Sequence, residues 1–158
     1  MAGNGTKRTD RASLLIKASP RATYRAFVSP DALVEWLPPT GMKGEIFAFE
    51  PRAGGAFRIA LIYEAPDPSR AGKTSDDTDI VEGRFVELVE NERIVQAITF
   101  EADDPAFAGE MTMTWSLIAV PGGTEVTITA KNVPTGISKE DHDAGLNSTL
   151  ANLAAFVE

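Results

Sequence analysis

The sequence predicts a single α+β domain in which a curved antiparallel sheet of about seven strands wraps around a long C-terminal helix. Three observations lead to this prediction. The 158 residues suffice for one domain with one hydrophobic core. Helical patterns occur only towards the two ends of the chain, whereas the middle alternates between apolar and polar residues as strands do. Short turns separate most of the strand patterns, so neighbouring strands are expected to pair as antiparallel hairpins.

The N-terminal segment divides into a leader and a first strand. Residues 1–10 lack an apolar pattern, and we expect them to form a flexible leader to one domain over residues 11–158. Residues 12–18 predict the first strand, because their large apolar side chains alternate along the chain.

Two Ser-Pro pairs mark the starts of two short helices. Serine is favoured at the N-cap and proline at the first helical position, so Ser19 and Ser29 predict helices over residues 20–28 and 31–36. The second helix is expected to end by Leu37 because a proline follows, and proline disfavours helical geometry in the residue before it.

Strand patterns fill the middle of the chain, and a helical pattern ends it. Six segments are expected to be strands, namely residues 45–50, 56–64, 80–88, 93–101, 110–120 and 125–131. A polar loop over residues 65–79 joins the second of these to the third. Residues 138–157 predict one long helix with Ser138 as its N-cap, and its apolar stripe recurs every three or four residues from Leu146.

Composition and charge argue against several classes of function. The formal net charge is −8, and residues 1–30 carry six basic residues and one acidic residue, or +5, so the remainder carries −13. Such an acidic body argues against nucleic-acid binding. The chain has no cysteine and one histidine, which excludes disulfides and thiol nucleophiles and leads us to expect no metal or other cofactor. We recognise no signal peptide and no apolar run long enough to span a membrane, so we expect a cytoplasmic protein.

Several local motifs occur in a distinctive order. They are Ala18-Ser19-Pro20-Arg21-Ala22-Thr23-Tyr24-Arg25-Ala26-Phe27, Ser29-Pro30-Asp31-Ala32-Leu33 with Trp36, Gly54-Gly55-Ala56-Phe57, Gly83-Arg84-Phe85-Val86-Glu87-Leu88 with Glu92-Arg93-Ile94-Val95, and Gly122-Gly123-Thr124-Glu125-Val126. In this order and spacing, the chain over residues 12–158 resembles the family of activator of ninety-kilodalton heat-shock protein ATPase homologues. The family usually has Gly-Trp near the start of the last helix, where this chain has Gly145-Leu146. The resemblance implies the helix-grip fold of the START-like (SRPBCC) superfamily.

The resemblance also implies a function. START-like proteins bind lipids, polyketides and other apolar molecules in a groove, and we expect this chain to bind such a ligand between its sheet and its C-terminal helix. The residues expected to line the groove are Trp36, Phe57, Ile59, Phe85, Glu87, Met113, Trp115, His142 and Leu146. The aromatic and aliphatic members of this set are equally typical of a closed core.

Two polar residues of this set carry alternatives of their own. His142 lies four residues before Leu146 and therefore continues the apolar stripe of the last helix. It would contact a ligand, act as a general acid or base, or hydrogen bond to a neighbouring strand. Glu87 would anchor a polar group of the ligand if it pointed inward, and would form a cross-strand surface pair if it did not.

Three functions stay open at this point. The first is a ligand-binding protein without catalysis, which fits the scarcity of catalytic groups, and we assign no catalytic and no metal-binding residue. The second is a co-chaperone-like interaction module that contacts a chaperone partner through its acidic surface. The third, a cyclase- or hydratase-type enzyme, would use His142 with a carboxylate such as Glu87. A homodimer is also left open, because edge strands and an amphipathic helix offer surfaces for one.

Overall fold

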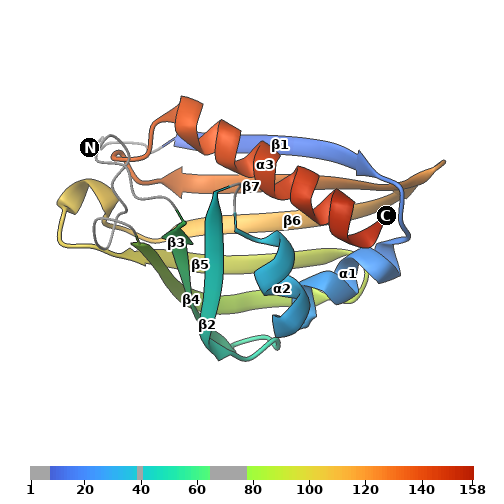
Figure 1. The fold of residues 1–158 in the computed structure, drawn as a ribbon, viewed down its shortest axis with the longest axis horizontal. Helices are drawn as coiled ribbons and strands as arrows, with labels where there is room; N and C mark the ends of the chain where they lie inside the picture. The colour runs from blue at the N-terminus through green and yellow to red at the C-terminus, as the bar shows by residue number, and fades with distance from the viewer. Residues whose placement is uncertain (1–7, 39–40, 65–77) are drawn as a thin grey trace.

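A computed structural model of the protein describes residues 8–38, 41–64 and 78–158 and consists of one antiparallel sheet with three α-helices against one of its faces (Figure 1). The seven strands are β1 (Arg8–Ile16), β2 (Met42–Phe49), β3 (Ala56–Tyr63), β4 (Thr78–Val89), β5 (Arg93–Glu101), β6 (Met111–Val120) and β7 (Gly123–Val133). The helices are α1 (Pro20–Val28), α2 (Pro30–Trp36) and α3 (Lys139–Val157), together with a short 3-10 helix, η2 (Pro105–Phe107).

The strands follow one another across the sheet except at one edge. Their order is β1-β7-β6-β5-β4-β3-β2, so β1 pairs with β7, and the edges of the sheet are β1 and β2. The chain passes from the first edge to the other through α1 and α2, and α3 runs back beside β1 (Figure 1). The predicted α+β helix-grip fold, with two short helices after the first strand, is confirmed.

The three α-helices begin where the serine signals predict. The side-chain oxygens of Ser19, Ser29 and Ser138 accept hydrogen bonds from the backbone N–H three residues further on, at 3.1, 3.4 and 3.1 Å. Each bond satisfies one of the N–H groups that a helix start leaves without an intrahelical partner, which is worth about 1 kcal/mol. In the described part of the chain, no helix is both long enough and apolar enough to cross a membrane.

The first strand begins closer to the N-terminus than the apolar pattern predicted. β1 begins at Arg8, not near residue 12, and pairs with β7 over its whole length. The pattern missed this start because the first residues of β1 are held by polar contacts; Asp10 is fully buried yet hydrogen-bonded. Residues 1–7 of the expected leader and residues 65–77 of the expected polar loop lie outside the described residues.

Aromatic side chains occupy the core between the sheet and the helices. The rings of Phe27, Trp36 and Trp115 meet edge to face, with centroids 4.8 to 5.7 Å apart. Phe85 lies between Phe49 and Phe57 at 5.7 and 5.2 Å. Such ring pairs add about 0.5–1.5 kcal/mol each to the free energy gained by burying their area. The first cluster joins α1 and α2 to β6, which fixes the two short helices on the sheet.

Candidate functional site

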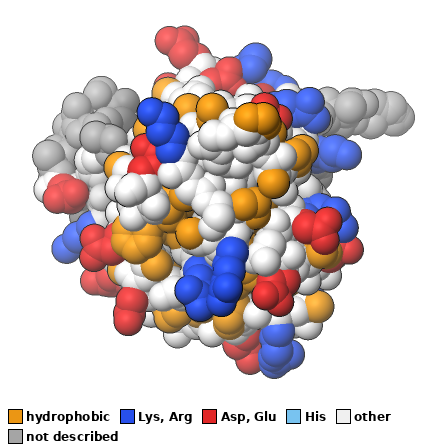
Figure 2. All heavy atoms as spheres, turned by 90° about the vertical axis from the view of Figure 1, so that its right-hand side faces the viewer, with side chains coloured by type: hydrophobic (Ala, Val, Ile, Leu, Met, Phe, Trp, Pro, Cys, Tyr) orange, Lys and Arg blue, Asp and Glu red, His pale blue; other side chains and the backbone are white. Residues whose placement is uncertain are grey.

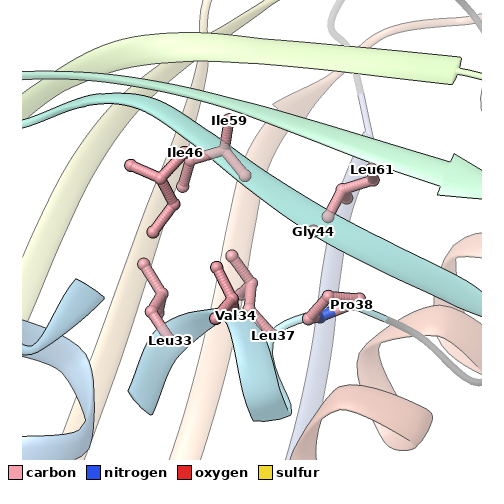
Figure 3. A pocket seen from close by; sticks show the side chains of 8 residues that line it. All are labelled: Leu33, Val34, Leu37, Pro38, Gly44, Ile46, Ile59 and Leu61. Atoms are coloured by element: carbon pink, nitrogen blue, oxygen red, sulfur yellow. The ribbon is translucent and has the colours of Figure 1, made fainter. Parts of the chain in front are cut away.

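A small apolar hollow, which we call the inner hollow, lies between α2 and the edge of the sheet formed by β2 and β3 (Figure 3). Its lining is entirely apolar and consists of Leu33, Val34, Leu37, Pro38, Gly44, Ile46, Ile59 and Leu61. Figure 3 shows the side chains of the helical segment facing those of the two strands across the gap. No part of this hollow is wide enough for a water molecule. An apolar space of this kind stays dry.

Pro38 lies close to β2 because the facing strand residue has no side chain. A Cβ atom placed on Gly44 would lie 3.1 Å from the Cγ atom of Pro38, closer than an ordinary van der Waals contact. Glycine at this position therefore allows the chain after α2 to descend onto the sheet. The proline itself is buried.

Two side chains of α3 hold the end of α2 in place, and we call them the α2 latch. The hydroxyl of Thr149 donates a hydrogen bond to the carbonyl oxygen of Leu37 at 3.3 Å, and the side-chain amide of Asn152 donates one to that of Pro38 at 2.9 Å. Both carbonyls lie just after α2, where no further helical turn supplies a donor, so the latch satisfies groups that would otherwise need water. It fixes the position of α2 above the inner hollow.

A second depression, the outer hollow, opens on the surface beside the latch. It has a volume of about 380 Å³ and lies between α2, the start of β2 and the C-terminal half of α3. Its lining consists of Glu35, Pro38, Gly41, Met42, Asn152, Ala155 and Phe156. Pro38 belongs to the walls of both hollows. The two hollows are therefore neighbours that share this proline.

A buried polar cluster lies at the other end of α3. Asp10 of β1 accepts hydrogen bonds from Nε and Nη2 of Arg8, at 2.7 and 2.9 Å, and from Nδ1 of His142, at 2.7 Å. Burial raises the pKa of the Asp10 carboxyl, but the hydrogen bonds from Arg8 and His142 outweigh it and hold the pKa below its ordinary value. Arg8 also donates to the carbonyl oxygen of Ile137 at 2.7 Å. The cluster therefore fastens the start of α3 to β1.

Charged side chains of β4 pair on the surface with charged residues of β5 and of the segment before β6. Arg93 donates to the carboxylate of Glu87 at 2.6 Å, and both side chains are more than two-fifths exposed. Arg84 pairs in the same way with Glu110 at 3.0 Å. Glu87 thus forms the cross-strand surface pair that was one of the two alternatives for this residue. At the end of the molecule shown in Figure 2, acidic and basic side chains are interspersed among hydrophobic ones and are not gathered by sign.

The chain matches a known protein family over most of its length. A model of the Activator of Hsp90 ATPase homolog 1-like protein family matches residues 17–158. The chain belongs to this family.

Solved structures of other proteins have the same fold as this member of the Activator of Hsp90 ATPase homolog 1-like family. A protein from Chromobacterium violaceum shares 33% sequence identity with this chain, covering 95% of it and 96% of the other, with a TM-score of 0.83. An AHSA1-like protein from Aeromonas hydrophila has the same fold, with a TM-score of 0.71 at 16% identity, covering 95% and 92% of the two chains. No curated protein matches the chain in sequence.

In this family member, most of the residues expected to line a groove lie inside the domain. The side chains of Trp36, Phe57, Phe85, Trp115 and Leu146 are each at most 5% exposed. Met113 is half-buried against the same core. Ile59 is the one expected residue that lines the inner hollow, and neither hollow includes the other eight. A role for these side chains in contacting a ligand stays a prediction.

The two polar candidates do not come together in either hollow. The imidazole of His142 is hydrogen-bonded to Asp10 of β1. This is the hydrogen bond to a neighbouring strand that was one of the three alternatives for this residue. Glu87 is hydrogen-bonded to Arg93. The arrangement thus offers no described site in which these two groups could share a proton with one substrate.

Sequence reasoning missed the residues that form the hollows. Leu33, Val34 and Leu37 recur at helical spacing and could have indicated that α2 presents an apolar face, but only Trp36 of that helix was singled out. Pro38 was interpreted only as a helix terminator. No sequence signal marks Asp10, because a buried carboxylate in a polar segment has no periodicity and depends on partners far along the chain.

Proposed function

We propose that the protein binds a small apolar molecule reversibly at the inner hollow, beneath α2, and that its role is binding rather than catalysis. The observation that carries the proposal is the hollow itself, whose eight lining residues present no polar side chain. Binding sites for apolar ligands are concave and lined in this way. The sequence led us to expect the ligand between the sheet and α3, whereas the inner hollow lies beneath α2.

Binding requires α2 to move outward. The gap holds no water-sized space, so a ligand must widen it. α2 forms one wall of the gap, so widening the gap displaces this seven-residue helix and breaks the two hydrogen bonds of the latch. Short helices have little stability of their own and depend on such tertiary contacts.

The family description does not by itself favour the co-chaperone alternative for this chain. No feature of the described residues points to a chaperone partner or to a second copy. Cytoplasmic location likewise stays a prediction.

Thermal unfolding in the presence of straight-chain alcohols from hexanol to decanol tests the proposal. A ligand at one hundred times its Kd stabilises the folded state by about 2.7 kcal/mol, which raises the Tm of a domain of this size by about 5–10 °C. Val34→Phe places a larger side chain in the hollow and is expected to abolish the shift. The matched control, Val86→Phe, alters a side chain that is 49% exposed on β4 and is expected to retain it.

Circular dichroism establishes that both variants are folded before the comparison is made. The proposal fails if no alcohol shifts the Tm of the unmodified protein. It also fails if folded Val34→Phe responds as strongly as the control.

A further inference from the structure

The outer hollow differs in chemistry from the inner one. Its apolar surface comes from Pro38, Met42, Ala155 and Phe156, the last of these 47% exposed. Its polar side chains are those of Glu35 and Asn152. Among the described residues that line it there is no lysine or arginine.

Both polar groups are available to accept hydrogen bonds. Glu35 is an exposed residue of α2, and the described residues provide no ion-pair partner for its carboxylate. The side-chain nitrogen of Asn152 is already used to donate to Pro38, which leaves the side-chain oxygen as the acceptor. A group that fits these two acceptors must itself carry donors or positive charge.

The aromatic ring in the hollow favours the same kind of group. A cation over the face of a phenylalanine ring is attracted by the ring quadrupole, and an uncompensated carboxylate adds an attraction that depends on salt. The body of the protein outside residues 1–30 carries a charge of −13, which further disfavours an anionic ligand.

We propose that the ligand is a cationic amphiphile, an alkyl or aryl amine, whose charged head occupies the outer hollow beside Glu35 and Phe156. Its apolar part passes Pro38 into the inner hollow. Because Pro38 lines both hollows, one molecule can place its charged head in the outer hollow and its apolar part in the inner one. This inference rests on the proposed function, because it assigns a ligand class to the same site.

Calorimetric titration with three probes of equal chain length tests the inference. The probes are decyltrimethylammonium, decan-1-ol and decyl sulfate, each below its critical micelle concentration. We expect the ammonium probe to bind about tenfold more tightly than the alcohol, from the combined carboxylate and ring attractions, and the sulfate to bind most weakly. The preference for the ammonium probe should shrink as sodium chloride is added.

Glu35→Gln removes the charge while keeping the shape of the side chain. It is expected to reduce the preference of about tenfold to about threefold or less, and to change the affinity for decan-1-ol far less, because glutamine can still accept a hydrogen bond from the hydroxyl. Glu125→Gln, at an exposed position on β7, changes the net charge by the same amount away from both hollows and should keep the full preference.

The outcomes separate the two proposals. If none of the probes binds, the proposed function fails, and the ligand class fails with it. If the alcohol and the ammonium probe bind equally, or if Glu35→Gln and Glu125→Gln behave alike, the ligand class is overturned while apolar binding at the inner hollow stands.

Discussion

Replacing Asp10 by asparagine tests how strongly the buried polar cluster fastens β1 to α3. The fully buried carboxylate accepts three hydrogen bonds of 2.7 to 2.9 Å, from Arg8 and His142. Asparagine keeps the shape of the side chain, but its amide nitrogen is a donor and would face an N–H group of Arg8 or His142, so at least one of these hydrogen bonds is lost. Breaking a buried pair costs about 3–5 kcal/mol. Because the side chain of Arg8 is 31% exposed and water can reach it, we expect about 2–3 kcal/mol, or a Tm about 5–10 °C lower.

The effect of this substitution should depend on pH. The pKa of Asp10 is lower in the folded than in the unfolded protein, where it is about 3.9, because burial is outweighed by the hydrogen bonds from Arg8 and His142. Such a group stabilises the fold fully above its unfolded pKa, and the stabilisation is lost as the pH falls through the folded pKa. The difference between the two proteins should therefore be complete at pH 7 and shrink below about pH 4.

Urea denaturation, followed by tryptophan fluorescence in steps from pH 7 to pH 3, measures both quantities. Asp103→Asn, at an exposed position in the loop before η2, serves as the control and should change little. Equal free energies of unfolding for Asp10→Asn and the unmodified protein at pH 7 would refute the reasoning. So would a difference that stays constant down to pH 3.

Two further predictions concern glycines and the latch. Gly83→Ala should destabilise by more than about 2 kcal/mol in urea denaturation, because its Cβ would lie 1.9 Å from the carbonyl oxygen of Ala97. Gly145→Ala meets no atom within 4 Å and should stabilise by up to about 1 kcal/mol; equal effects at the two glycines would contradict this account. Thr149→Val and Asn152→Ala should each cost about 1 kcal/mol and speed amide exchange in α2. Unchanged exchange in both variants would show that the latch does not hold that helix.

Local signals predicted the framework of the fold well. The Ser-Pro pairs set the starts of α1 and α2, and the observed bounds of α1 are those expected from the sequence. These signals succeed because capping is decided within a few residues. The predicted start of β1 was wrong because its first residues are stabilised by the Arg8 guanidinium, the Asp10 carboxylate and the His142 imidazole, the last of which lies 132 residues from Asp10.

The candidate site was harder to foresee for a different reason. Aromatic residues on the inward face of a strand suit a core and a ligand groove equally, and the sequence does not show which helix will cover them. The inner hollow depends on the fit between Pro38 and Gly44 and on the height at which α2 is held. This gap between α2 and the sheet arises only when the two layers pack together. No periodic pattern of residues in the sequence indicates it.

The pairing of β1 with β7 has a consequence for how the chain folds. Its register joins Ile16 to Thr124 and Arg8 to Val133, contacts that close loops of more than one hundred residues. Contacts between distant residues slow folding, because the loop entropy is lost before the contact forms. During synthesis, β1 leaves the ribosome first and finds its partner strand almost last. Until then Leu14 and Leu15, both at least 36% exposed even in the finished sheet, lie on an unpaired edge. Until β7 is available, β1 therefore presents a free strand edge through which the nascent chain can aggregate.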